Sequence, residues 1–398
     1  MSKIICGAPW SSANFSPQGF QFCCQHNRQH YPYSTLAAWL DSPELRLFQQ
    51  RMTAEDYDSI CRRCLDGGHN AGYGMYVPHG EPLKPGELWM VNFFMSSHCN
   101  IACRTCSPHF SDTQSNFRRK LGLPHQPAVE RPYDVIQAVL EVNRRGARHA
   151  IIAGGDPVYD ELYKEILLYL RKDIQIAVVT NGQRYDDEFF ALVAQFDRFR
   201  VSFSQDGPTE VNEYMRTFAR TERSYATMHE WLTRYDPDGT HTGLGITLSN
   251  ITVFHLLEFA LEVQAELPTC ANNLELTYTV VSHPSYFTPS NLPAHLRQQA
   301  AEKIQADLAR LSEIGTEGSL LRRSFQEICE QALRLLTLRD FVPAEWTEFL
   351  RFNSIHDAAL PPGIALENLL CESPSVTIST VLSWPLVSTC GTSTSSAC

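Results

Sequence analysis

The chain has 398 residues, of which 43 % are hydrophobic and 19 % are charged, and its formal net charge is −11. This composition is typical of a folded globular protein. The acidic balance argues against a general nucleic-acid binder, which presents a basic surface. The sequence has no run of about 18 apolar residues and no N-terminal secretory signal. We therefore expect a cytoplasmic protein whose partners include neither a membrane nor nucleic acid.

Residues 1–80 are rich in Gly, Pro, Asn, Ser and His, and their periodicity is weak. One helix is expected to begin near Ser34, and a second to cover residues 44–52. The segment offers few apolar residues for a core of its own. We therefore predict that residues 1–80 form a small cysteine-rich domain that a metal cluster stabilises.

From residue 87 onward, apolar runs with strand character alternate with segments of helical periodicity. The predicted strands are 88–95, 149–155, 174–182, 199–207, 242–249 and 274–281. The predicted helices are 133–145, 160–172, 186–196, 221–233, 254–264 and 293–311. This alternation predicts an α/β fold with a parallel sheet, a partial (β/α)6 TIM-like barrel over residues 87–312. A helical extension is expected at 313–371 and a Ser/Thr-rich tail at 372–398.

Cysteine is the main chemical clue, because eight of the 13 cysteines precede residue 107. Three of them form Cys99-Asn-Ile-Ala-Cys103-Arg-Thr-Cys106, directly after the first predicted strand. Three thiolates on one loop can hold three irons of a [4Fe–4S] cube and leave the fourth iron for a small molecule. A structural zinc site would need four protein ligands. Chance spacing or a zinc loop remains the alternative.

The C-x3-C-x2-C motif after the first strand of a partial barrel resembles the radical S-adenosylmethionine (SAM) superfamily. The resemblance implies that Cys99, Cys103 and Cys106 bind a [4Fe–4S] cluster whose open iron chelates SAM. One electron from a donor such as flavodoxin or ferredoxin would then cleave SAM to a 5′-deoxyadenosyl radical. One position departs from the family, which usually has a bulky residue where this chain has Thr105.

Polar motifs follow the later strands, where parallel folds place their sites. Gly154-Gly155-Asp156-Pro157 is similar to the family's Gly-Gly-Glu-Pro motif, which meets the SAM amino group. Because Asp156 is one methylene shorter than Glu, we expect the backbone carbonyls of this turn to carry more of the contact. A plain glycine turn is the alternative.

Further candidates are placed near SAM or the substrate by the same resemblance. They are Thr180, Asn181, Ser202, Ser204, Asp206, Arg216 and His283. The guanidinium of Arg216 suits capture of the SAM carboxylate. The alternatives are an ordinary Asn-Gly turn after Thr180, a surface role for Arg216 and a structural role for His283.

The N-terminal cysteines resemble the SPASM/twitch auxiliary-cluster modules of many radical SAM enzymes. The resemblance implies a second, auxiliary [4Fe–4S] cluster with cysteine ligands. They are Cys6, Cys24 or its neighbour Cys23, Cys61 and Cys64. A zinc ribbon that uses the same cysteines with His26 or His30 is the alternative, because zinc and iron–sulfur sites share C-x2-C knuckles.

The substrate class rests on resemblance alone. Many enzymes with auxiliary modules modify ribosomally made peptides, so a peptide is the first expectation. A small metabolite such as a sugar or nucleoside is the second, and a non-catalytic zinc-binding interaction protein is an alternative of a different class. The tail at 372–398 is either a flexible terminus or a fused mimic of a peptide substrate.

Overall fold

The structure is a computed structural model that describes residues 6–23, 26, 29–58, 61–62, 87–126, 130–281, 284–361 and 366–370. Three predicted site residues, Cys24, Cys64 and His283, lie outside the described residues, as does the tail at 372–398.

The central feature is one sheet with the strand order β10-β9-β7-β6-β5-β3-β1-β2. Its six barrel strands are β3 (Met90–Phe93), β5 (His149–Ile152), β6 (Gln175–Thr180), β7 (Phe199–Ser204), β9 (Thr242–Leu248) and β10 (Glu275–Val280). Every neighbouring pair among these six is parallel. The α/β fold with a partial barrel is therefore confirmed, and each strand lies within its predicted range.

The helices that follow these strands are also present. They are α6 (Val135–Arg144), α7 (Leu162–Tyr169), α8 (Asp187–Val193), α10 (Thr221–Tyr235), α11 (Leu256–Glu266) and α12 (Ala294–Ala309). Alternate strand residues such as Val178, Val201 and Leu244 are fully buried in the core that contains helix residues. Their neighbours Ser202 and Gly245 are half-buried, so the other face of these strands lines a more open barrel interior.

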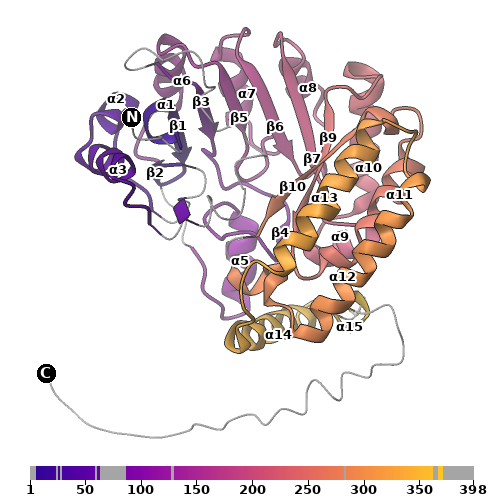
Figure 1. The fold of residues 1–398 in the computed structure, drawn as a ribbon. Coiled ribbons are helices and arrows are strands. Elements are labelled where there is room, and N and C mark those ends of the chain that lie inside the picture. The colour runs from indigo at the N-terminus through magenta and orange to yellow at the C-terminus, as the bar shows by residue number, and fades with distance from the viewer. Residues whose placement is uncertain are drawn as a thin grey trace, which may run out of the picture.

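The N-terminal segment joins this sheet, which the sequence did not predict. β1 (Ser12–Ser16) and β2 (Gly19–Gln21) form a hairpin, and β1 runs parallel to β3. Beside them lie α1 (Ala8–Ser11), α2 (Leu36–Leu40) and α3 (Pro43–Thr53), on one side of the sheet in Figure 1. Phe15, Phe20 and Trp39 are buried and in ring contact. These aromatic side chains belong to the same buried core as the barrel strands, so the N-terminal elements extend that core.

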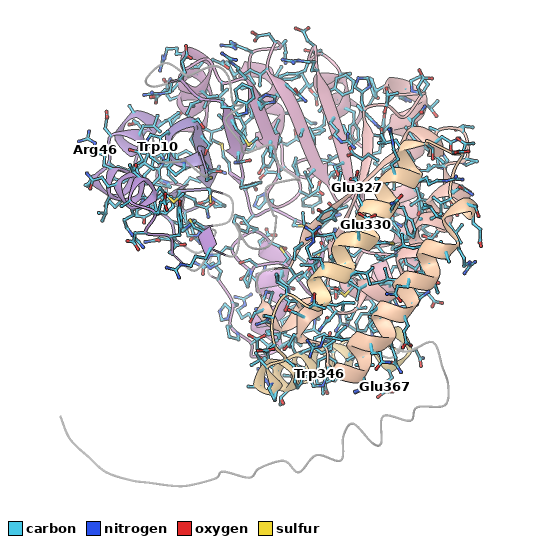
Figure 2. The ribbon with its side chains drawn as sticks, viewed as in Figure 1. Trp10, Arg46, Glu327, Glu330, Trp346 and Glu367 are labelled. Carbon is cyan, nitrogen blue, oxygen red and sulfur yellow. The ribbon has the colours of Figure 1, made fainter. Side chains whose placement is uncertain are left out.

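The C-terminal extension is helical, as predicted. Its helices are α13 (Leu320–Leu336), α14 (Pro343–Ala358) and α15 (Leu366–Leu370). α13 packs against β10, where the Ser324 hydroxyl accepts a hydrogen bond from Leu276 N at 3.0 Å. In Figure 2, Glu327 and Glu330 on α13 lie far across the molecule from Trp10 and Arg46 on the N-terminal elements. Among the described helices, none is both long and apolar enough to cross a membrane.

Candidate active site

The three-cysteine loop leaves β3 and is fixed at several points. Between its cysteines, β4 (Ala102–Cys103) pairs antiparallel with β8 (Arg216–Thr217), so that Cys103 lies opposite Arg216. The loop then enters α5 (Asp112–Lys120), where Asp112 Oδ1 accepts a hydrogen bond from Cys99 N at 3.1 Å. The cysteines are therefore held in a defined loop. The sequence predicted neither the β4–β8 pair nor α5. The two strands are too short to show a pattern, and most residues of α5 are polar.

The structure brings the three thiols together. Burial is the main cause that raises the pKa of Cys99, Cys103 and Cys106 to about 12. The negative charge of a neighbouring cysteine thiolate contributes to the rise at each of the three. The Arg216 guanidinium opposes this rise at Cys103 and Cys106, and its Nη1 lies 3.9 Å from Cys103 Sγ. Three soft sulfur donors beside one buried cation fit a cluster whose thiolate ligands carry negative charge.

The glycine turn after β5 packs directly against the cysteine loop. Gly154 and Gly155 have φ values of 91° and 57°. A Cβ at Gly155 would lie 2.2 Å from His98 O, and one at Gly154 would lie 2.8 Å from the Cα of Phe94. Both positions therefore need glycine, for backbone conformation and for the close approach of two backbones. The turn is therefore packed tightly against the backbone that leads into the cysteine loop.

Asp156 is buried, and its carboxylate bridges the ends of β5 and β6. It accepts hydrogen bonds from Asn181 N at 2.6 Å, Val158 N at 3.0 Å and the Thr180 hydroxyl at 3.0 Å. Burial raises the pKa of Asp156, and these hydrogen bonds oppose that shift. Asp156 and Thr180 are thus brought together, and both carboxylate oxygens are engaged within the protein.

Asn181 links the end of β6 to the cysteine loop. Its side-chain amide donates to Asn100 Oδ1 at 2.8 Å and approaches Cys99 Sγ at 3.7 Å. Hydrogen bonds to ligand sulfurs shift the reduction potential of an iron–sulfur cluster. Asn181 is therefore placed to act on a cluster at Cys99.

Asp206 and Arg216 form a buried ion pair, with 3.0 Å between Oδ2 and Nε. The other carboxylate oxygen of Asp206 accepts from Thr247 N at 2.8 Å. α9 (Thr209–Met215) ends one residue before Arg216, which opens β8. As a result, its side chain lies between Asp206 and Cys103.

Ser202 and Ser204 lie on the half-buried face of β7, opposite the two glycines of β9. A Cβ at Gly245 would lie 3.3 Å from Ser202 Oγ and 3.4 Å from Thr277 Oγ1. The Arg200 guanidinium passes over Gly243 of β9 to pair with Glu275 on β10. A Cβ at Gly243 would lie 2.6 Å from Arg200 Nη2. This part of the barrel interior is therefore narrow, lined by hydroxyl groups, and carries an ion pair near the start of β7.

Arg104 is a site residue that sequence reasoning missed. It is 1 % exposed and donates to Tyr214 O at 2.8 Å, Asn353 Oδ1 at 2.8 Å and Asp357 Oδ1 at 2.7 Å. These contacts tie the cysteine loop to α9 and α14. The sequence offers one indication of this role, the position of Arg104 directly after Cys103. A charged side chain next to a predicted cluster ligand needs a polar partner within the protein.

The N-terminal cysteines fall into two places among the described residues. Cys6 and Cys23 pack against the small apolar group that contains Met90 and Ala153. Cys61 Sγ lies 3.7 Å from His26 Nε2. The structure thus brings Cys61 together with His26, a residue that the cluster prediction did not include.

Part of the barrel matches a known protein family. Residues 93–259 match the model of the Radical SAM superfamily. The chain is similar to the solved structure of polyhistidine-tagged anSMEcpe with bound AdoMet, at 15 % identity over 58 % of this chain and 61 % of that one, with a TM-score of 0.41. It is also similar to Streptococcus suis SuiB bound to precursor peptide SuiA, at 12 % identity over 73 % and 57 % of the two chains, with a TM-score of 0.39.

The chain thus spans about six tenths of the length of these two structures. No curated protein matches it. The family match over residues 93–259 implies a [4Fe–4S] cluster and SAM as cofactors. Residues 93–259, a little less than half of the chain, therefore match a radical SAM domain.

Proposed function

We propose that Cys99, Cys103 and Cys106 hold the catalytic [4Fe–4S] cluster, and that SAM binds beside it at the ends of β5, β6 and β7. One observation carries the proposal: on the three-cysteine loop, Cys99 Sγ lies beside Asn181 and Cys103 Sγ lies beside Arg216. When bound, the cluster supplies one electron for the reductive cleavage of SAM, which yields the radical that abstracts hydrogen from a substrate.

The residues of the chain prepare this site electrostatically. Arg216 supplies positive charge against the thiolates while Asp206 fixes its orientation. Asn181 donates toward Cys99. Asp156 holds the β5 and β6 ends in register, so the backbone carbonyls of the glycine turn, rather than its carboxylate, are the groups we assign to the SAM amino group. Ser202 and Ser204 face the interior beyond this point, toward the substrate.

A peptide is the substrate class that we propose first. Support comes from the N-terminal cysteines, whose pattern resembles auxiliary modules of peptide-modifying enzymes. Cys6 and Cys23 precede and follow the β1–β2 hairpin and contact the same apolar group. An auxiliary [4Fe–4S] cluster held by four cysteines stays a prediction, with Cys6, Cys24 or Cys23, Cys61 and Cys64 as its ligands. A flavodoxin or ferredoxin donor and a substrate-like tail also stay predictions.

One observation favours the second candidate, a small metabolite such as a sugar or nucleoside. The interior beside β7, β9 and β10 is lined by Ser202, Thr277 and two glycines, and Arg200 and Glu275 form an ion pair across it. Hydroxyl groups and an ion pair suit a compact polar ligand.

The experiment is anaerobic reconstitution with iron and sulfide, followed by incubation with SAM and dithionite. We expect 5′-deoxyadenosine by mass spectrometry from the wild type, and none from a triple Cys99/Cys103/Cys106→Ala variant. Cys329→Ala is the control, because Cys329 is a buried cysteine that lies on α13. A fully iron-loaded wild type that forms no deoxyadenosine, or a triple variant that still forms it, contradicts the proposal.

Substrate class is tested by incubation with peptide mixtures and with sugars or nucleosides, each deuterated at carbon. Deuterium that enters deoxyadenosine identifies the substrate class. Transfer only from a sugar or nucleoside would replace the peptide proposal.

A further inference from the structure

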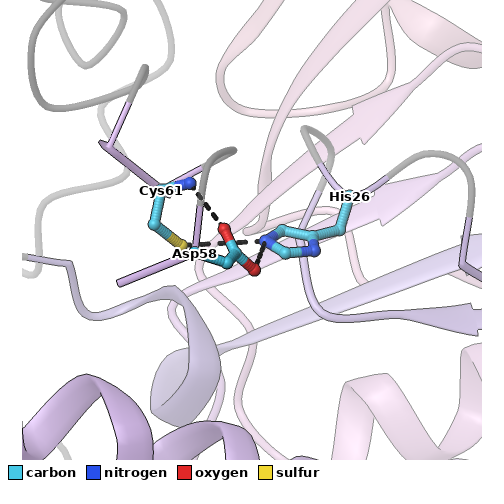
Figure 3. A group of neighbouring side chains, drawn as sticks. All are labelled: His26, Asp58 and Cys61. Atoms are coloured by element: carbon cyan, nitrogen blue, oxygen red, sulfur yellow. Dashed lines mark hydrogen bonds and ion pairs between the residues drawn. The ribbon is translucent and has the colours of Figure 1, made fainter. Parts of the chain in front are cut away.

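A second group of metal-binding side chains lies outside the radical SAM domain. His26 follows β2, whereas Asp58 and Cys61 follow α3. One donor atom from each residue lies within 4.8 Å of the other two. Figure 3 shows the three side chains pointing toward one another from separate segments.

The spacing of the donors matches a tetrahedral ion. His26 Nε2 lies 3.5 Å from Asp58 Oδ2 and 3.7 Å from Cys61 Sγ. Zinc bonds of about 2.0–2.1 Å to nitrogen and oxygen and about 2.3 Å to sulfur place these ligands about 3.3 Å and about 3.6 Å apart. A direct hydrogen bond from nitrogen to a carboxylate would instead be about 2.7–3.2 Å long.

The environment is also that of a built site. His26 is 3 % exposed, so its ring is fixed by packing against Phe22 and Phe48. Asp58 Oδ1 accepts a hydrogen bond from Cys61 N at 2.8 Å, which leaves Oδ2 directed at His26. Such an orienting hydrogen bond to a ligand carboxylate is typical of metal sites. Asp58 is 28 % exposed, so an ion and a water molecule can reach the group from solvent.

We propose that His26, Asp58 and Cys61 bind a single zinc ion. Mixed nitrogen, sulfur and carboxylate donors suit this borderline-soft metal, and a fourth ligand, water or another side chain, completes the tetrahedron. The ion connects the segment after β2 to the segment after α3. This site is independent of SAM cleavage. In this proposal Cys61 is a zinc ligand and not a ligand of an auxiliary cluster.

The test uses the full chain, purified without oxygen and reconstituted with iron and sulfide. Zinc is counted by mass spectrometry, and Co²⁺ is exchanged into the zinc-free protein as a spectroscopic probe. We expect about one zinc per chain, the visible absorption of tetrahedral Co²⁺, and a thiolate-to-cobalt band. His26→Gln and Asp58→Asn should lose zinc at least tenfold, and Cys61→Ser should lose the thiolate band.

Asp56→Asn is the matched control, because Asp56 is two residues away and pairs with Arg51 at 2.8 Å. It should retain zinc. Deoxyadenosine formation, which depends on the other cysteines, shows that each variant is folded. A wild type without zinc or tetrahedral cobalt overturns the proposal, as does zinc that survives both His26→Gln and Asp58→Asn. Iron at Cys61 that neither of these variants affects would assign Cys61 to an auxiliary cluster and also overturn it.

Discussion

Arg104 and Asp357 are 253 positions apart in the sequence, yet the guanidinium donates to the carboxylate at 2.7 Å. Arg104 stands between two cysteines of the cluster motif, and Asp357 lies on α14 in the C-terminal extension. The extension therefore fixes the position of the cysteine loop, although α14 contributes no cysteine to it.

Asp357→Asn removes the charge that compensates Arg104 and keeps the shape of the side chain. Because Arg104 is 1 % exposed, weakening its charged partner should lower the free energy of unfolding by about 2 kcal/mol. We also expect less iron per chain after reconstitution, because the loop is less well fixed. Urea unfolding and iron analysis measure the two effects.

Glu348→Gln is the control on the same helix, because Glu348 pairs with Arg351 at the surface. It should change the free energy of unfolding by no more than about 0.5 kcal/mol. Equal effects of Asp357→Asn and Glu348→Gln would show that Arg104 does not depend on Asp357.

Gly155→Ala tests how closely the turn after β5 must approach the cysteine loop. Its Cβ would lie 2.2 Å from His98 O, so the backbone of the loop would have to move. Gly146→Ala is the control, since Gly146 has a similar positive φ of 68° but no atom within 4 Å of the added Cβ. Gly146→Ala should cost about 1 kcal/mol for the left-handed backbone alone. Gly155→Ala should cost about 3 kcal/mol in total and reduce deoxyadenosine formation.

Thermal unfolding and deoxyadenosine assays compare the two glycine variants. If Gly155→Ala is no worse than Gly146→Ala, the turn does not restrain the loop and only the backbone conformation requires glycine.

The barrel could be predicted from the sequence because its strands are apolar runs that end in polar motifs. The hairpin could not, because β1 is Ser-Ala-Asn-Phe-Ser and its burial depends on a distant partner. Asn14 on β1 and Asn92 on β3 are both buried and hydrogen-bonded to each other. In the sequence, two asparagines that are buried and joined by a hydrogen bond resemble loop residues.

The candidate site could be predicted only in part, because some of its residues belong to sequence motifs and others do not. Motif spacing identified the thiols and the strand-end residues, and the structure brings Cys103 and Asp206 to opposite sides of Arg216. What the sequence could not give is which carboxylates are engaged within the protein, as that of Asp156 is, and which distant helix supports the loop. These depend on tertiary contacts that leave no local pattern.

His356 provides a test of stability against pH. It is fully buried on α14, between Phe117 at 5.1 Å and Phe352 at 4.2 Å between ring centroids. Burial and, to a smaller extent, the positive charges of Arg104 and Arg118 together lower the pKa of His356 from 6.5 to about 3. The folded chain therefore keeps this imidazole neutral in weak acid, whereas the unfolded chain protonates it.

Because the folded pKa lies below the unfolded one, the stability that His356 contributes is fully present above pH 6.5. It is lost as the pH falls toward 3, at about 1.4 kcal/mol per pH unit for one proton. His356→Phe should remove this part of the pH dependence, since a similar ring fills the space without a proton to bind. Urea unfolding of both proteins between pH 7 and pH 4 measures the difference, with His295→Gln, an exposed position on α12, as the control. If wild type and His356→Phe lose stability in parallel over this range, His356 is protonated in the folded chain and its site is open to water.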